Sequence, residues 1–229
     1  MKLTSPIHIL KMQAKRLKRT QSISMVAAFD QIAQAEGYGS WSLLQAKAKA
    51  YKPKTADEIL DYIYAGDLVL LAARPGLGKT KMALEILLKA IGQNRLGFFF
   101  SFEYTKSETI AKLKALDDNF NPDNPLLKLD CSDQISAQYI INATQNVLVK
   151  DSLIVVDYLQ LLDQQREKPT LQQQVEDLKT YAKQTGCILI FISQIDRKFE
   201  QDDRQMPNLD DIRLPNPLDL SLFNKCIFV

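Results

Sequence analysis

Apolar residues recur at helical spacing through the first fifty positions of the chain, which predicts a small helical unit. One stripe consists of Ile7, Leu10, Ala14 and Leu17, and a second of Val26, Phe29, Ile32 and Ala33. Ser24 is placed to cap a second helix over residues 25–36, and Ser40 a third, shorter helix that holds Trp41. We expect the Trp41 indole in the core of this unit, which spans residues 1–54 and ends in a linker.

From residue 67 onward, near-continuous apolar runs alternate with amphipathic stretches. The predicted strands are residues 68–73, 96–101, 126–129, 153–156, 188–192 and 222–229. The predicted helices are residues 79–91, 107–116, 135–148 and 171–184. The alternation predicts an α/β domain over residues 55–229, with a mostly parallel central sheet flanked by helices. Residues 163–170 and 196–217 are polar and are predicted to be loops.

Composition excludes several classes of protein. The 229 residues are 46% hydrophobic and 24% charged, and they contain neither a run long enough to cross a membrane nor a secretory signal. Cys131, Cys187 and Cys226 lie too far apart for a zinc site, and we expect the last two to be buried thiols. His8 is the only histidine, which excludes histidine triads. These features favour a cytoplasmic protein without a membrane partner.

Charge is distributed unevenly along the chain. Residues 1–54 contain ten Lys and Arg against two Asp and Glu, whereas the remainder contains 19 against 25. A basic arm on an acidic body indicates either an anionic partner such as nucleic acid or simply a solvated helix face. The candidate nucleic-acid contacts in this arm are Lys11, Lys15, Arg16, Lys18 and Arg19.

A glycine-rich segment between the strand at 68–73 and the helix at 79–91 is typical of a phosphate-binding loop. Its candidate cofactor-binding residues are Arg74, Pro75, Gly76, Leu77, Gly78, Lys79 and Thr80. The glycines let backbone amides turn toward phosphates, the Lys79 ammonium reaches the β- and γ-phosphates, and the Thr80 hydroxyl ligates a metal. The cofactors expected are therefore ATP and Mg²⁺. Ala73 stands where the strict pattern has glycine.

Three further polar residues follow buried strands. Asp157 is the expected second Mg²⁺ residue, Glu103 the candidate catalytic base, and Gln194 a candidate sensor of the γ-phosphate or the attacking water. Asp157 and Gln194, taken alone, are also compatible with ordinary strand ends. Because the carboxyl ends of parallel strands share one edge of a sheet, we expect all three near Thr80.

Taken together, these segments resemble the ATPase domain of DnaB-type replicative helicases, within the RecA-like P-loop NTPase superfamily. The matching stretches are residues 66–80, 100–103, 154–162, 192–198 and 207–213. The resemblance implies catalytic roles for Lys79, Glu103 and Gln194. It also implies a homo-oligomeric ring, hexameric in this family, that works with replication proteins. Single-stranded DNA would face the two polar loops, including Arg197 and Lys198.

The chain departs from the family pattern in two ways. Family members usually carry a larger N-terminal helical domain, and they extend past the last matched strand to a basic finger that reaches a neighbour's ATP. This chain ends at Val229. Hydrolysis is therefore expected to be slow unless a finger comes from elsewhere. Two functions stay open: a DNA-dependent, helicase-like ATPase, and a nucleotide-gated binding or regulatory protein without helicase activity.

Overall fold

A computed structural model describes residues 1–101, 103–159, 162, 169–201, 204, 206–214 and 216–229. The chain divides into two compact units, Met1–Lys54 and Thr55–Val229. Each unit has a hydrophobic core of its own.

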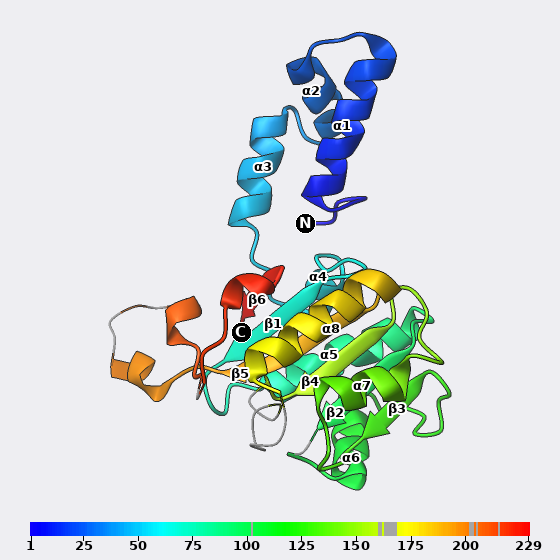
Figure 1. Cartoon of the computed structure of the whole chain (residues 1–229), viewed down its shortest axis with the longest axis vertical. Coiled ribbons are helices and arrows are strands. Elements are labelled where there is room, and N and C mark those ends of the chain that lie inside the picture. The colour runs from blue at the N-terminus through cyan, green and yellow to red at the C-terminus, as the bar shows by residue number, and fades with distance from the viewer. Residues whose placement is uncertain (102, 160–161, 163–168, 202–203, 205, 215) are drawn as a thin grey trace. The chain divides into compact units, whose positions relative to one another are not determined.

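The first unit contains three helices, α1 (Ile7–Gln21), α2 (Met25–Ala35) and α3 (Trp41–Ala50) (Figure 1). The predicted caps are confirmed, since the Ser24 hydroxyl accepts from the Ala27 amide at 3.1 Å and the Ser40 hydroxyl from the Leu43 amide at 3.3 Å. These bonds satisfy amides that the helix itself leaves unpaired. Val26, which the sequence places in the apolar stripe of α2, is not part of the core. Its side chain is 70% exposed because it lies in the first turn of α2, before the segment that packs.

Trp41 is buried in the core of the first unit, as the sequence predicts. Its ring stacks on Phe29 with centroids 4.7 Å apart, and its amide donates to the Asp30 carboxylate at 2.8 Å. The core around it is formed by Leu3, Leu10, Ala33, Trp41 and Leu44.

Replacing Trp41 with alanine is expected to destabilise the first unit by about 3–5 kcal/mol, the usual cost of emptying a large aromatic site. Hydrogen exchange measures the effect: amides of α1 to α3 lose protection, while amides of residues 55–229 keep theirs. Unchanged protection in α1 would show that the indole does not hold this core together.

The second unit is built on a six-stranded sheet in the order β3-β2-β4-β5-β1-β6, in which every neighbouring pair is parallel. The strands are β1 (Leu68–Ala73), β2 (Gly97–Ser101), β3 (Leu127–Asp130), β4 (Leu153–Asp157), β5 (Ile188–Gln194) and β6 (Lys225–Phe228). The helices are α4 (Ala56–Leu60), α5 (Lys79–Gly92), α6 (Lys106–Leu116), α7 (Ala137–Thr144) and α8 (Leu171–Thr185). The α/β class and the flanked parallel sheet are confirmed.

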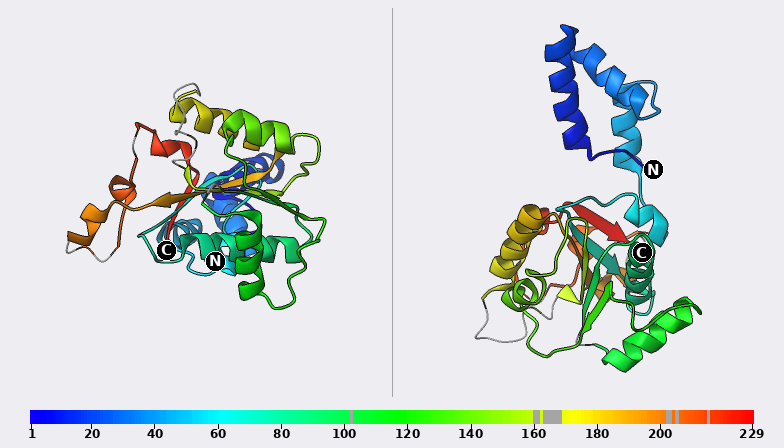
Figure 2. Two further views of the ribbon diagram at one scale, coloured as in Figure 1. Left: turned by 90° about the horizontal axis from the view of Figure 1, so that it is seen from below. Right: turned by 90° about the vertical axis from the view of Figure 1, so that its right-hand side faces the viewer.

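Helices cover both faces of the sheet (Figure 2). One core packs α7 and α8 against alternate strand residues such as Leu70 and Phe191. The other core packs α4, α5 and α6 against the intervening ones, such as Leu71 and Ile190. Because successive strand residues point to opposite faces, a strand covered on both sides has to be apolar throughout. All six residues of β1 are buried accordingly.

The structure corrects several predicted boundaries. The last strand begins at Lys225 rather than 222, because Leu220–Leu222 forms a 3-10 turn and the Asn224 side chain accepts from the Leu68 amide before pairing begins. Helix α7 is shorter than residues 135–148. The sequence analysis missed α4, whose capping box joins Thr55 and Glu58.

The described residues of the predicted loop at 196–217 include short elements of secondary structure. The loop contains the 3-10 turns η2 (Arg197–Gln201) and η3 (Leu209–Asp211), and an isolated bridge joins Ile195 to Ile212. In the predicted loop at 163–170, residues 163–168 lie outside the described residues.

The thiols differ from expectation at one position. Cys187 is buried as predicted, but Cys226 is only partly buried, on the edge strand β6. That burial still raises the pKa of the Cys226 thiol to about 11.

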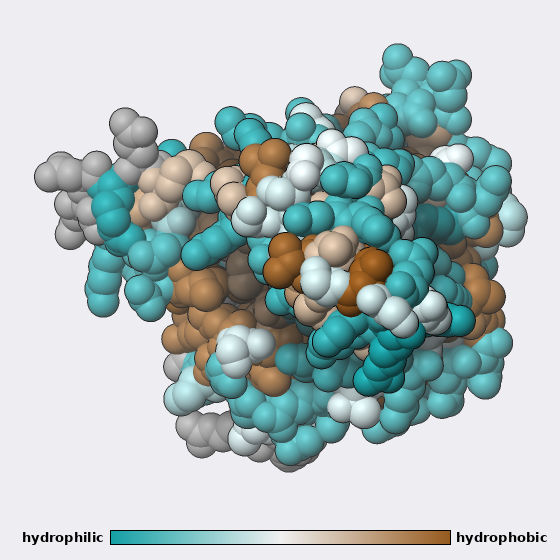
Figure 3. Space-filling model, turned by 90° about the horizontal axis from the view of Figure 1, so that it is seen from above, coloured by the Kyte–Doolittle hydropathy of each residue, from teal (hydrophilic) through white to brown (hydrophobic). Residues whose placement is uncertain are grey.

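Among the described helices, none combines the length and the apolar character needed to cross a bilayer. In the space-filling view of Figure 3, hydrophilic residues cover most of the face turned to the viewer, with hydrophobic residues between them.

Candidate active site

The turn between β1 and α5 is shaped by two glycines. Gly76 and Gly78 each have a φ of 78°, in the left-handed region that other residues occupy only under strain. Helix α5 then begins at Lys79 without any side-chain cap. Its first-turn amides therefore point out of the helix end with no side-chain acceptor. Together with the helix dipole, they form an anion-binding end.

This helix end opens into a cavity of about 640 Å³. The lining residues come from the turn, from α5, from the segment after β2 and from α6: Gly76, Gly78, Lys79, Thr80, Lys81, Leu84, Glu103, Tyr104, Lys112, Ala115 and Leu116. The lining thus combines polar and cationic groups with aliphatic side chains. A cavity of this size accommodates a ligand as large as a nucleotide.

Asp157 lies at the carboxyl end of β4 and is completely buried. Within the described parts of the chain, neither of its carboxylate oxygens accepts a hydrogen bond. Desolvation, followed by the charge of Glu103, raises the pKa of Asp157 to about 7. The nearby Thr80 hydroxyl and Lys79 ammonium lower the pKa of Asp157. The Thr80 hydroxyl nevertheless forms no hydrogen bond with the carboxylate.

A buried carboxylate without a partner is costly unless a cation joins it. The neighbouring oxygen of Thr80, itself 8% exposed, completes a pair of hard oxygen donors of the kind that Mg²⁺ prefers. The residues present therefore fit a magnesium ion.

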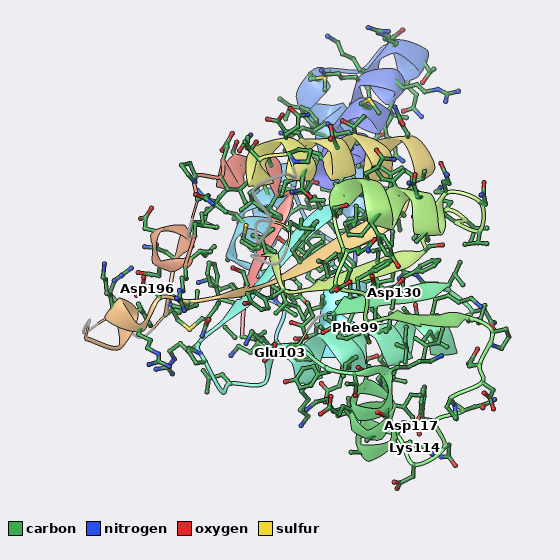
Figure 4. The ribbon with its side chains drawn as sticks, turned by 60° about the horizontal axis from the view of Figure 1, so that its bottom comes forward. Phe99, Glu103, Lys114, Asp117, Asp130 and Asp196 are labelled. Atoms are coloured by element: carbon green, nitrogen blue, oxygen red, sulfur yellow. The ribbon has the colours of Figure 1, made fainter. Side chains whose placement is uncertain are left out.

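Glu103 follows the end of β2, the strand that carries Phe99 (Figure 4). Its amide donates to the Ser101 hydroxyl at 3.1 Å, and its side chain is exposed and lines the cavity. Ser101 is in register with Asp157 on β4, so the two carboxylates arise from neighbouring strand ends. Phe102, between Ser101 and Glu103, lies outside the described residues.

Gln194 ends β5 in register with Ala73, the last residue before the glycine turn. The Ile195 amide donates to the Ala73 carbonyl at 3.0 Å, which fixes this strand end beside the start of the turn. The sheet thus places Gln194 next to the turn, but its side chain does not line the cavity. Arg74, Pro75 and Leu77 do not line it either, and Leu77 is 51% exposed.

The candidate nucleic-acid residues fall into both units. Lys11, Lys15, Arg16, Lys18 and Arg19 are exposed along α1. Arg197 and Lys198 are exposed in η2, directly after Asp196 beyond the end of β5 (Figure 4).

Two cavity residues were missed by the sequence analysis. The Lys112 ammonium lies 4.3 Å from the centre of the Tyr104 ring, a cation–π distance, and both side chains line the cavity. Burial, followed by the charges of Glu103 and Asp157, raises the pKa of Tyr104. No motif marks Lys112. The capping box of Thr105 and Glu108 marks the start of α6 just after Glu103, but it does not give the direction of the helix.

The fold and this site define the class of the protein. A parallel sheet whose first strand runs through a glycine turn into α5, with an acid ending β4, is the architecture of RecA-like P-loop α/β domains. More particularly, residues 54–125 and 123–216 match the model of the DnaB-like helicase C terminal domain. The chain belongs to this family.

Curated relatives agree with this assignment. A probable replicative DNA helicase of Trieres chinensis is 26% identical over 86% of this chain and 50% of its own length. The replicative DNA helicase DnaB of Geobacillus stearothermophilus is 28% identical over 69% of this chain and 41% of its own. The chain therefore spans half or less of the length of these relatives.

Solved structures share the fold. A DnaB-like replicative helicase, solved in a study of its interactions with primase, superposes with a TM-score of 0.55 at 22% identity. That match covers 90% of this chain and 61% of the other. A solved ATPase domain gives a TM-score of 0.54 at 24% identity, with 75% of each chain covered.

Proposed function

We propose that the second unit binds ATP with Mg²⁺ in the 640 Å³ cavity and hydrolyses it. The observation that carries this proposal is the buried carboxylate of Asp157, which has no hydrogen-bond partner among the described residues. It lies near Thr80, which is in the first turn of α5, a helix without a side-chain cap. Phosphate needs amide donors and a cation, and a magnesium ion needs hard oxygen ligands. The turn glycines, Lys79 and Thr80 line the cavity, and the Asp157 carboxylate, which does not line it, lies close enough to Thr80 and Lys79 for both to act on its pKa.

Each residue near the cavity has a role in this proposal. The amides of the turn between Gly76 and Thr80 donate to phosphate oxygens, and the Lys79 ammonium contacts the terminal phosphates. Thr80 and Asp157 hold Mg²⁺, which when bound neutralises phosphate charge. Arg74, Pro75 and Leu77 shape the turn without lining the cavity, whereas the aliphatic side chains of Leu84, Ala115 and Leu116 line it.

Hydrolysis in this arrangement is an in-line displacement at the γ-phosphorus. Glu103 accepts a proton from the attacking water as the water oxygen bonds to phosphorus and the bond to the ADP oxygen breaks. Lys112, in cation–π contact with Tyr104, adds a further cation to the cavity beside those of Lys79 and Lys81. Gln194 lies beside the turn, where closure of the site would let its amide report on the terminal phosphate.

We further propose that this ATPase works in DNA replication, on single-stranded DNA and within a homo-oligomeric ring, with other replication proteins as its partners. Membership of the DnaB-like family and relatives named as replicative helicases support this setting. Arg197 and Lys198, exposed beyond β5, are the proposed DNA contacts of this unit.

The test measures ATP binding and turnover by the full chain, with and without single-stranded DNA. Lys79→Ala is expected to weaken ATP binding about 10- to 100-fold, because a charge-assisted contact to phosphate is lost. Lys114→Ala, on the same sheet face in α6 but away from the cavity, is the matched control and keeps wild-type affinity.

Two outcomes separate the alternatives. Turnover stimulated by DNA supports the helicase-like ATPase. Tight ATP binding without turnover under any condition contradicts it and leaves a nucleotide-gated binding protein.

A further inference from the structure

One face of α1 carries Lys11, Lys15, Lys18 and Arg19. This face does not contribute to the core of its own unit. The core is supplied by other positions of the helix, Leu10 and Ala14, which are fully buried. At about 100° per residue the four cations fall within an arc of roughly 100° on the remaining surface, over about 12 Å of helix length. All four are exposed.

The acids of the first unit do not neutralise this face. The unit has two, and both are engaged elsewhere. The Asp30 carboxylate accepts the Trp41 amide at 2.8 Å and so secures the start of α3. The Glu36 carboxylate accepts the Thr4 amide at 2.9 Å and the Thr4 hydroxyl. Over the described residues, none of the four cations on α1 forms an ion pair.

Helix electrostatics explain only part of the pattern. Lys18 and Arg19 lie in the last turn of α1, where a cation is favoured by the helix dipole. Lys11 and Lys15 lie in the first half and middle of the helix, where that effect has faded. Like charges four residues apart repel one another, so this row costs stability in the free protein. A row of cations that repel one another in the free protein is stabilised when it binds a row of negative charges.

We infer that this face of α1 binds the phosphate backbone of a nucleic acid, without reading its bases. Phosphodiester charges repeat along a strand at a spacing that a row of cations over two turns can meet. An anionic membrane is the less suitable partner. A helix that lies on a membrane buries an apolar face in it, and the apolar face of α1 is already used by the core of its unit.

This inference is independent of ATP hydrolysis. It gives the first unit a task of its own: to hold nucleic acid whatever nucleotide occupies the second unit. The residues involved lie outside the cavity, so their loss leaves nucleotide binding intact, and the two proposals can fail separately.

The experiment uses the full chain without nucleotide and measures fluorescence anisotropy with a labelled 30-nucleotide single strand and with the matched duplex. The variant combines Lys11→Gln, Lys15→Gln, Lys18→Gln and Arg19→Gln. The control removes four exposed cations of the second unit: Lys114→Gln, Lys128→Gln, Lys150→Gln and Lys183→Gln. Fluorescence of the stacked Trp41 and circular dichroism verify that both proteins are folded.

The wild-type protein is expected to lose affinity steeply with salt. The α1 variant should bind at least about 10-fold more weakly at 0.1 M salt, with the slope of log K against log salt reduced by about 3, since each lost phosphate contact removes about 0.7–0.9 from it. The control should stay within about twofold of wild type in affinity, because its charges lie on other elements.

Three results would overturn the inference: no binding of either nucleic acid by the wild type, equal affinity and slope in the α1 variant, or binding of phosphatidylserine vesicles with none of DNA. The ratio of the single-strand to the duplex affinity identifies which form of nucleic acid α1 prefers.

Discussion

Glu103→Gln is expected to reduce ATP turnover about 10²- to 10⁴-fold while ATP binding is kept, the usual range for loss of a general base. The carboxylate lines the cavity from the end of β2, and its amide is fixed by Ser101. Glutamine preserves the size of the side chain but cannot accept a proton from water at neutral pH. Single-turnover hydrolysis of radiolabelled ATP separates the chemical step from binding and release.

The matched control is Glu176→Gln on α8, which makes the same chemical change away from the cavity. It should turn over ATP at the wild-type rate. If Glu103→Gln hydrolyses ATP as fast as this control, Glu103 is not the base.

Asp157→Asn is expected to have opposite effects on stability and activity. Without magnesium the wild-type protein buries an unpartnered carboxylate, and burial raises the pKa of Asp157 to about 7. The rise in this pKa from near 4 to about 7 corresponds to about 4 kcal/mol. A neutral amide avoids this cost, so the variant should be more stable than wild type by as much as about 4 kcal/mol at pH 8 in EDTA. Turnover with magnesium should fall at least about 100-fold, because a charged ligand of the ion is lost.

The pH dependence follows from the direction of that shift. Since the pKa of Asp157 is higher in the folded state than its ordinary value near 4, the wild-type protein loses stability as pH rises from about 4 to about 7 and then changes no further through this group. The advantage of the variant should therefore shrink as pH falls and vanish near pH 4. Urea unfolding between pH 4 and 8 measures it. If the difference in unfolding free energy between variant and wild type did not change with pH, or if the variant were less stable at pH 8, burial of the Asp157 charge would not destabilise the protein.

The parallel sheet could be predicted from the sequence because strands covered on both faces must be apolar throughout. For β1 the run from Leu68 to Ala73 gave the strand bounds directly. The same signal failed at the last strand, where the run continues unbroken through a 3-10 turn and periodicity cannot separate the two. Helix α4 was missed because five residues are too few to show a helical repeat.

The candidate site was predictable where the chain itself brings residues together. The turn through Gly76 and Gly78 carries its own geometry, and parallel pairing places Asp157 opposite Ser101 and Gln194 opposite Ala73. Lys112 depends on the direction in which α6 leaves the sheet, which no local pattern records. The position of Gln194 outside the cavity lining likewise depends on side-chain packing rather than on strand order.

The strand order has a consequence for how the chain is made. β1 lies between β5 and β6, both of which follow it in sequence, the first by roughly 115 residues. At about 5–20 residues per second, a ribosome exposes the wholly apolar β1 for on the order of 6–23 s before its first partner strand has been synthesised. The glycine turn directly follows the end of that strand. The candidate site is therefore assembled only after β5 has been synthesised, and a chain terminated before β5 presents an unpaired hydrophobic strand to chaperones and proteases.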